Sequence, residues 1–204
     1  MMYKRFIKRG LDIFLSTLGI IILAPFLLLI CIFIMIDSKG PIIFTQKRVG
    51  KDSTHFNIYK FRTMKVDTPK EIPTHLLDNP NFFITNTGRF LRKTSLDELP
   101  QLFNILKGDM SIIGPRPALW NQYDLIEERD KYEANSIRPG LTGSAQISGR
   151  DELEISLKAK LDGDYTQNIS FILDVKCFIG TIFSVVKSEG VVEGNKDSSK
   201  EVDE

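Results

Sequence analysis

The hydrophobic pattern of the chain is dominated by one apolar run near the amino terminus. Residues 13–36 form 24 consecutive positions without a charged side chain, and a helix needs roughly 20 such residues to cross a bilayer. The run has no polar face, which disfavours a buried helix of a soluble core. It exceeds the roughly 7–15 apolar residues of a secretory signal, and no small-residue cleavage site follows it. The pattern predicts a membrane helix that stays on the protein.

The middle and the flanks of this run favour a helix that enters and leaves the membrane on the same side. Pro25, preceded by Ala24, lies near its centre, where proline removes a backbone hydrogen bond and kinks a helix. Basic residues flank both ends, and such residues stay on the cytoplasmic face. A re-entrant helix kinked at Ala24-Pro25 is therefore favoured over a bent span. The basic flanking residues are Lys4, Arg5, Lys8 and Arg9 before the run, and Lys39, Lys47, Arg48 and Lys51 after it.

The rest of the chain has the pattern of a small, mostly helical α+β domain. Two β-type runs around a turn containing Gly50 predict a hairpin, and the Pro-, Asp- and Asn-rich residues 66–88 predict a loop. Residues 170–187 predict an amphipathic helix lying on the core or on the headgroup region. We expect a membrane segment over residues 1–40, a cytosolic-face domain over 41–190 and a disordered tail over 191–204. The predicted strands are 41–45 and 55–59, and the other predicted helices are 95–107, ending at Gly108, and 119–135.

Charge is distributed unevenly along the 204 residues. The net charge is +1 overall, yet residues 1–65 carry eleven basic and three acidic side chains, and the remainder is acidic. A basic block beside an apolar run suits anionic headgroups, and the motifs of nucleic-acid binding are absent from the sequence. Cys31 and Cys177 lack disulfide or metal spacing, and neither His55 nor His75 has a second metal ligand at useful spacing.

Two adjacent carboxylates, Asp97 and Glu98, are the first candidates for chemistry. They follow Thr94-Ser95, a helix-start signal, and the first turn of a helix attracts anions or can present carboxylates to a metal. A structural interpretation remains open, because Ser95 and Glu98 have the spacing of a capping box. An aspartate in the first turn of a helix, as predicted for Asp97, also commonly compensates the positive end of the helix dipole.

Three arginines in glycine- and proline-rich loops point to phosphate. Arg116 lies between two prolines in residues 114–117, Arg138 precedes Pro-Gly, and Arg150 follows Gly149. One guanidinium group can form two hydrogen bonds with phosphate oxygens at the same time. Loops rich in glycine and proline let the backbone approach a ligand closely. Neither a P-loop nor a dinucleotide-binding glycine motif is present. The acidic pair and the arginines together predict a phosphate-chemistry site at a membrane.

These segments resemble a known family. Residues 60–64 (KFRTM), 92–102 (RKTSLDELPQL), 108–111 (GDMS), 114–117 (GPRP), 138–143 (RPGLTG) and 149–150 (GR) are similar, in order, to the bacterial sugar transferases called monotopic phosphoglycosyl transferases. The resemblance covers nearly the whole chain. It implies a re-entrant helix kinked at a proline, and an enzyme on the cytoplasmic face of the bacterial inner membrane. Such an enzyme transfers a sugar 1-phosphate from a UDP-sugar to undecaprenyl phosphate, releases UMP, and begins capsule, exopolysaccharide or glycoprotein glycan synthesis.

The resemblance also implies roles for the acidic pair. Asp97 would be the nucleophile that attacks the phosphorus bearing the sugar, forming a covalent phosphosugar aspartate. Mg²⁺ held partly by Asp97 and Glu98 would neutralise the diphosphate. Glu98 would support the metal or deprotonation of the acceptor.

The basic residues complete the implied site. Arg92 and Arg150 would hold phosphate oxygens, Arg116 would fix the loop that closes the site, and Lys60 would join the same electropositive pocket. Arg138 is a further candidate for phosphate binding. Two positions depart from the family's pattern: Ala24 stands where a serine is usual, and Ser144 where a large residue is common. The first bears on the kink and the second on the donor pocket.

Two other functions compete with this interpretation. A non-catalytic membrane adaptor that recruits glycan-assembly enzymes would not need the acidic pair. A glycosidase is disfavoured, because adjacent residues would have to place carboxyls about 5 Å or more apart across a sugar. The resemblance favours an N-acetylated hexosamine as the sugar, and an apolar or amphipathic surface could serve a homodimer.

Overall fold

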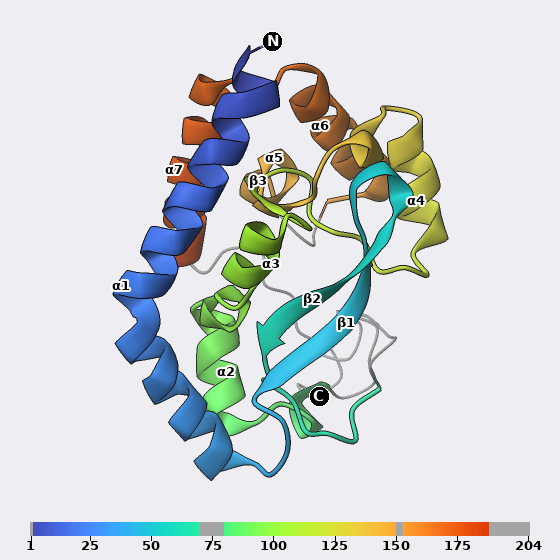
Figure 1. Cartoon of the computed structure of the whole chain (residues 1–204). Helices are drawn as coiled ribbons and strands as arrows, with labels where there is room; N and C mark the ends of the chain where they lie inside the picture. The colour runs from blue at the N-terminus through green and yellow to red at the C-terminus, as the bar shows by residue number, and fades with distance from the viewer. Residues whose placement is uncertain (1, 70–79, 150–152, 188–204) are drawn as a thin grey trace.

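A computed structural model describes residues 2–69, 80–149 and 153–187 of the chain (Figure 1). A long amino-terminal helix, α1, runs along one side of the molecule; α2 and α3 pack against it, and α7 contacts its amino-terminal end. A two-stranded hairpin and the remaining helices lie on the other side of α3. The helices are α1 (Lys8–Asp37), α2 (Asn86–Lys93), α3 (Gln101–Lys107), α4 (Tyr123–Asp130), α5 (Ser144–Ile147), α6 (Ile155–Gln167) and α7 (Phe171–Lys187), and the strands are β1 (Ile43–Val49), β2 (His55–Phe61), β3 (Ser111–Ile113) and β4 (Gly140–Thr142).

Helix α1 contains the predicted apolar run and is long and apolar enough to cross a membrane. It is a continuous helix through Pro25, and Figure 1 shows that it curves along its length. Only 11% of its most apolar window is buried in the protein, so α1 is not a core helix. Most of its apolar side chains are exposed, with Ile30 and Ile34 as buried exceptions, and lipid can cover the exposed ones.

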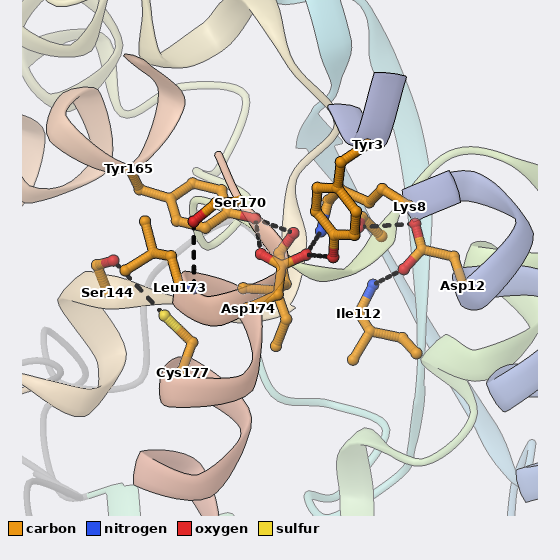
Figure 2. A network of polar contacts seen from close by, with 12 residues as sticks. Tyr3, Lys8, Asp12, Ile112, Ser144, Tyr165, Ser170, Leu173, Asp174 and Cys177 are labelled. Atoms are coloured by element: carbon orange, nitrogen blue, oxygen red, sulfur yellow. Dashed lines mark hydrogen bonds and ion pairs between the residues drawn. The ribbon is translucent and has the colours of Figure 1, made fainter. Parts of the chain in front are cut away.

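A network of buried polar contacts fixes the amino-terminal end of α1 (Figure 2). Asp174 of α7 accepts hydrogen bonds of 2.6 Å each from the Tyr3 hydroxyl, the Lys8 ammonium and the Tyr165 hydroxyl. Burial, and then the Asp174 charge, raise the pKa of Tyr165, so this hydroxyl remains a donor. Within α1, the Asp12 carboxylate accepts from the Ser111 hydroxyl at 2.8 Å and from the backbone N–H that follows at 3.0 Å. The network therefore joins α1 to α6, α7 and β3.

The other end of α1 is held by the segment that follows the hairpin. The Arg62 guanidinium donates to the carbonyls of Ser38 and Lys39 at 2.6 and 2.7 Å, which are orphan acceptors at the end of a helix. The Asp37 carboxylate accepts from the backbone N–H of Thr87 at 2.8 Å. Both ends of the membrane helix are thus attached to the rest of the protein.

The predicted hairpin is confirmed. Strands β1 and β2 pair antiparallel, with Ile43 opposite Phe61 and Val49 opposite His55. Side chains of β2 enter two parts of the core, which also receive residues from α1, α2 and α3. The two groups of buried apolar residues are Ile30, Ile34, Phe61 and Leu91, and Ile58, Leu102, Ile105 and Met110.

The predicted helix over residues 95–107 is wrong at its amino-terminal end. Ser95 adopts a left-handed conformation with φ of 56°, a 3₁₀ turn covers Leu96–Glu98, and α3 begins only at Gln101, after Pro100. The left-handed residue redirects the chain, and Pro100 cannot donate a helical hydrogen bond. The helix ends at Gly108, with φ of 99°, as predicted.

Several further elements differ from the sequence-based expectation, among them α2 and α5, which the sequence pattern did not predict. The predicted helix over 119–135 is shortened to α4 and a 3₁₀ turn, because Leu119 forms a β-bridge with Arg48 and Glu133 is left-handed. Helix α6 and the parallel pair β3–β4 were not predicted. The expected helix over 170–187 is confirmed as α7. The predicted tail, 191–204, lies outside the described residues.

Candidate active site

The acidic pair lies in the 3₁₀ turn between α2 and α3. Asp97 is buried, with 8% of its surface exposed, and Glu98 is partly buried beside it. The turn is preceded by the left-handed Ser95, whose side chain makes no capping hydrogen bond. The capping box is therefore not formed, and Glu98 is available for side-chain contacts elsewhere.

Glu98 is held by two cations. Lys60 of β2 donates to Oε1 at 2.7 Å, and Arg116 donates to Oε1 at 2.7 Å and to Oε2 at 3.4 Å. Burial alone would raise the pKa of Glu98, but Arg116 and Lys60 outweigh it and hold this pKa well below its usual range. Glu98 is thus ionised at neutral pH and holds both cations in place.

Asp97 has a different electrostatic environment. Burial is the largest influence and raises the pKa of Asp97; the Glu98 charge adds to it, while Lys60, Arg92 and Arg116 oppose it. The Lys60 ammonium lies 3.7 Å from Oδ2. A desolvated carboxylate with a raised pKa, once ionised, is a stronger base and nucleophile than an exposed one.

Asp97 lines a cavity of about 320 Å³ between the hairpin and the segment after it. The described lining residues include five cations against one carboxylate, so the cavity suits a polyanion such as a diphosphate. The lining comprises Pro41, Ile43, Phe44, Thr45, Gln46, Arg48, Lys60, Phe61, Arg62, Thr63, Met64, Lys65, Val66, Thr68, Pro69, Arg92 and Asp97.

Helix α2 brings Arg92 to this cavity through a close backbone approach. The Thr85 hydroxyl caps the helix by accepting from the Gly88 N–H at 3.0 Å. A Cβ at Gly88 would lie 2.0 Å from the carbonyl oxygen of Thr63, so only glycine allows this packing. One turn later, Arg92 donates to the Thr63 hydroxyl at 3.5 Å.

The loop that carries Arg116 is held by its carbonyl groups. Four successive carbonyls, from residue 115 to residue 118, accept hydrogen bonds in turn from the Gly140 N–H, the Arg129 guanidinium, the Arg48 guanidinium and the Val49 N–H, over 2.8–3.0 Å. Arg129 is itself paired with the buried Asp162. Because β1, α4 and β4 all hold this loop, Arg116 is aimed at Glu98.

The structure brings together only part of the predicted site. Asp97, Glu98, Lys60, Arg92 and Arg116 meet as described. Arg138 instead donates to the carbonyl of Gly108 at 2.8 Å, at the opposite end of α3, and does not line the cavity.

Two other predicted positions are not found in the cavity: one lies outside the described residues and the other lies away from the cavity. Arg150 lies outside the described residues. Ser144 lies 3.6 Å from the sulfur of Cys177, under α7, and is not among the cavity-lining residues, so its expected effect on the donor pocket is not supported.

Sequence reasoning missed Arg48 and Arg62 as residues of this site. Both line the cavity, while Arg48 also binds the Arg116 loop and Arg62 binds the end of α1. Arg62 lies within KFRTM, which would have been a signal. Arg48 was counted only as a basic flank of the membrane segment.

The acidic pair fits a metal that is shared with a substrate. Among the described residues, no three His, Cys, Asp or Glu side chains come together, and both oxygens of Glu98 already accept from Arg116. Mg²⁺ in phosphate-transfer sites is typically held by one or two carboxylates, substrate phosphates and water. Asp97 and Glu98 match that donor set, and they do not form a complete protein cage.

Known proteins similar to this chain carry sugar-transferase names. The chain is 36% identical over 193 residues to the UDP-N-acetylgalactosamine-undecaprenyl-phosphate N-acetylgalactosaminephosphotransferase of Aeromonas hydrophila, a match covering 91% of this chain and 45% of that protein. It is 39% identical over 188 residues to the UDP-glucose:undecaprenyl-phosphate glucose-1-phosphate transferase of Escherichia coli, covering 88% and 40%. The chain thus spans less than half the length of these two relatives.

A shorter relative and the family comparison give the same result. The chain is 42% identical over 156 residues to the uncharacterized sugar transferase EpsL of Bacillus subtilis, covering 76% of this chain and 75% of that protein. The family described as "Bacterial sugar transferase" matches residues 3–188, which include α1, the cavity and the acidic pair. The chain therefore belongs to the bacterial sugar transferase family and is of the phosphoglycosyl transferase type.

Proposed function

We propose that this protein transfers a sugar 1-phosphate from a UDP-sugar to undecaprenyl phosphate, as a first membrane step of capsule, exopolysaccharide or glycan synthesis. One observation carries the proposal: the buried carboxylate of Asp97 faces a cation-lined cavity. The names of the two relatives with a stated reaction support the acceptor and the transferred group.

The first half-reaction is an attack by Asp97 on the donor. A carboxylate oxygen bonds to the phosphorus that bears the sugar, and the bond from that phosphorus to the bridging oxygen breaks, so UMP leaves with the electron pair. Lys60 and Arg92 lie where they can bind oxygens of the diphosphate. Mg²⁺, when bound at the acidic pair with the diphosphate, would neutralise charge on the leaving phosphate.

The second half-reaction restores Asp97. A phosphate oxygen of undecaprenyl phosphate attacks the same phosphorus, the bond to the Asp97 oxygen breaks, and a polyprenyl diphosphate sugar is released. Glu98 stays ionised and keeps Lys60 and Arg116 in place throughout.

The membrane arrangement is part of the proposal. The apolar surface of α1, with basic residues near both of its ends, supports a helix that enters the cytoplasmic leaflet and returns. Pro25 lies near the centre of α1, where such a helix would be deepest. Helix α7 exposes Phe171, Ile172, Phe178 and Phe183 and would lie in the interface.

The donor sugar is proposed to be an N-acetylated hexosamine. The Aeromonas hydrophila relative is named for N-acetylgalactosamine, which supports it, whereas the Escherichia coli relative is named for glucose. UMP release should therefore be measured with a panel of UDP-sugars, undecaprenyl phosphate and Mg²⁺, using protein in detergent or nanodiscs.

Asp97→Asn is the matched control, because it keeps the shape of the side chain and removes the nucleophile. Release with one sugar that is lost in Asp97→Asn would support the proposal and name the donor. Equal release by the Asp97→Asn protein would refute it. Folded protein that releases no UMP with any sugar would favour a membrane adaptor.

A further inference from the structure

The mouth of the active-site cavity differs chemically from its interior. Among the described lining residues, those exposed to solvent are Pro41, Ile43, Thr45, Lys65, Val66 and Pro69. Four of these six are apolar, whereas the buried and half-buried lining residues contain Arg48, Lys60, Arg62, Arg92 and Asp97. The entrance is therefore mostly apolar, with Lys65 as its one described cation, and the other four described cations of the lining lie further inside.

This mouth lies close to the end of α1. Pro41 lies four residues after Asp37, the last residue of α1, and in Figure 1 the chain turns directly from the end of α1 into β1. A Cβ on Gly40 would lie 2.6 Å from a methyl group of Val66 and 2.2 Å from the Arg62 guanidinium, so these side chains pack closely on the turn.

Arg62 links the turn to the cavity. Arg62 lines the cavity and also binds the carbonyls at the end of α1. The Arg62 N–H donates to the carbonyl of Ile42 at 2.8 Å. On the helix side, Met35 and Ile36 are 53% and 77% exposed. The last turn of α1 and the entrance of the cavity are thus both rich in exposed apolar side chains, and the short turn 37–40, which carries the exposed Lys39, joins them.

We propose that this surface is the acceptor's docking site: the isoprenoid chain lies along the carboxy-terminal end of α1 and over Ile43 and Val66, and its phosphate reaches inward to Asp97. This inference rests on the proposed function. A water-soluble nucleotide sugar does not need an apolar entrance beside a membrane helix, whereas a lipid phosphate matches both the apolar mouth and the cationic interior. Because UMP leaves before the acceptor reacts, the same cations can bind each phosphate in turn.

The experiment compares Ile43→Ser and Val66→Ser with the unaltered protein. Ile43 and Val66 are 38% and 52% exposed, so both variants should fold. Removing about two buried methylene equivalents should raise the KM for undecaprenyl phosphate roughly tenfold. The KM for the UDP-sugar, and the single turnover of UMP released without acceptor, should change much less than the KM for undecaprenyl phosphate.

Two control variants separate docking from a general effect of polarity. Val66→Leu keeps an apolar side chain and should retain a normal KM for the acceptor. Tyr123→Ser removes an exposed apolar side chain, 62% exposed, from α4, which lies on the side of the molecule away from α1 in Figure 1; it should also leave this KM unchanged. An isoprenyl phosphate too short to reach Val66 should not distinguish the serine variants from the unaltered protein.

Measuring the binding of undecaprenyl phosphate directly tests the inference independently of the transferase activity. Retention of undecaprenyl phosphate by the detergent-held protein, read by native mass spectrometry, should fall about tenfold in Val66→Ser and stay unchanged in Tyr123→Ser. Unaltered retention in both Ile43→Ser and Val66→Ser would overturn the inference, as would a rise in the KM for the UDP-sugar as large as the rise for undecaprenyl phosphate. Equal UMP release by Asp97→Asn would instead overturn the proposed function, and the binding result would stand apart from it.

Discussion

Replacement of Arg129 by methionine tests how the Arg116 loop is supported. Arg129 and Asp162 form a buried ion pair, with side chains 2% and 1% exposed. Arg129 donates to Asp162 Oδ2 through Nε at 2.9 Å and through Nη2 at 2.5 Å, and to the Arg116 carbonyl through Nη1 at 2.8 Å. Methionine fills much of the same volume but removes the charge and all three donors.

The expected loss of stability follows from burial. Removing one member of a buried ion pair leaves an uncompensated charge and costs about 3–5 kcal/mol, a large part of the roughly 5–15 kcal/mol that stabilises a typical domain. Replacing both members by apolar residues is often neutral. The free energy of unfolding should therefore fall by about 3–5 kcal/mol in Arg129→Met and largely recover in Arg129→Met combined with Asp162→Leu.

The loss should also depend on pH. Burial already raises the pKa of Asp162, with Arg129 opposing the rise, and removing Arg129 raises the folded-state pKa further. A carboxyl whose folded pKa exceeds its unfolded value contributes stability below the unfolded pKa and loses it as pH rises through the folded pKa. The deficit of Arg129→Met should therefore be largest at neutral pH and shrink as the pH is lowered towards 4.

Urea unfolding in detergent, followed by tryptophan fluorescence, measures these differences. Trp120 is the single tryptophan of the chain and lies within the segment between Arg116 and α4, with the Lys47 ammonium 5.1 Å from the centre of its ring. If the free energy of unfolding fell by less than about 1 kcal/mol in Arg129→Met, or if the double variant were as unstable as Arg129→Met, the buried ion pair would not have the stabilising role assigned to it.

Three further predictions concern the acidic pair and the polar network at the start of α1. Lys60→Met should slow UMP release about a hundredfold and raise the pKa of Asp97, because Lys60 lowers it; rates measured against pH would show both, and an unchanged profile would contradict the assigned role. In the unaltered protein, the rate of UMP release should rise with pH through an apparent pKa above the ordinary aspartate value of 3.8, because burial raises the pKa of Asp97 and the ionised form attacks. A rate that falls in acid only at or below pH 3.8 would contradict this prediction. Asp174→Asn should lower the free energy of unfolding by about 1–3 kcal/mol, because Lys8 loses its buried counter-ion; thermal unfolding that matches the unaltered protein would contradict it.

Much of the fold could be predicted where one local pattern decides the structure. The apolar run of α1, the alternation in the hairpin, the glycine stop at Gly108 and the periodicity of α7 all depend on near neighbours in the chain. The helix start at Ser95 was wrong because Glu98 has stronger partners, Lys60 and Arg116, than the backbone N–H of a capping box.

The chemistry of the candidate site could be predicted from the sequence, but the set of residues that form the site could not. An arginine beside glycine and proline looks the same in sequence whether it faces a ligand or caps a helix. Arg116 is aimed at Glu98 by distant elements, while Arg138 binds the carboxy-terminal end of α3. The buried network around Asp174 joins residues more than 160 positions apart, and no local pattern indicates such contacts.

The proposed mechanism requires Asp97 to become covalently bonded to the transferred sugar phosphate. The most direct measurement mixes the protein with its UDP-sugar and Mg²⁺, without acceptor, and follows UMP release together with the intact mass and peptide map of the protein. We expect the release of up to one UMP per active site and an added phosphosugar on the peptide that carries Asp97. Both should be absent in Asp97→Asn. Folded, active protein that releases UMP only after undecaprenyl phosphate is added, with no change in its mass, would contradict it.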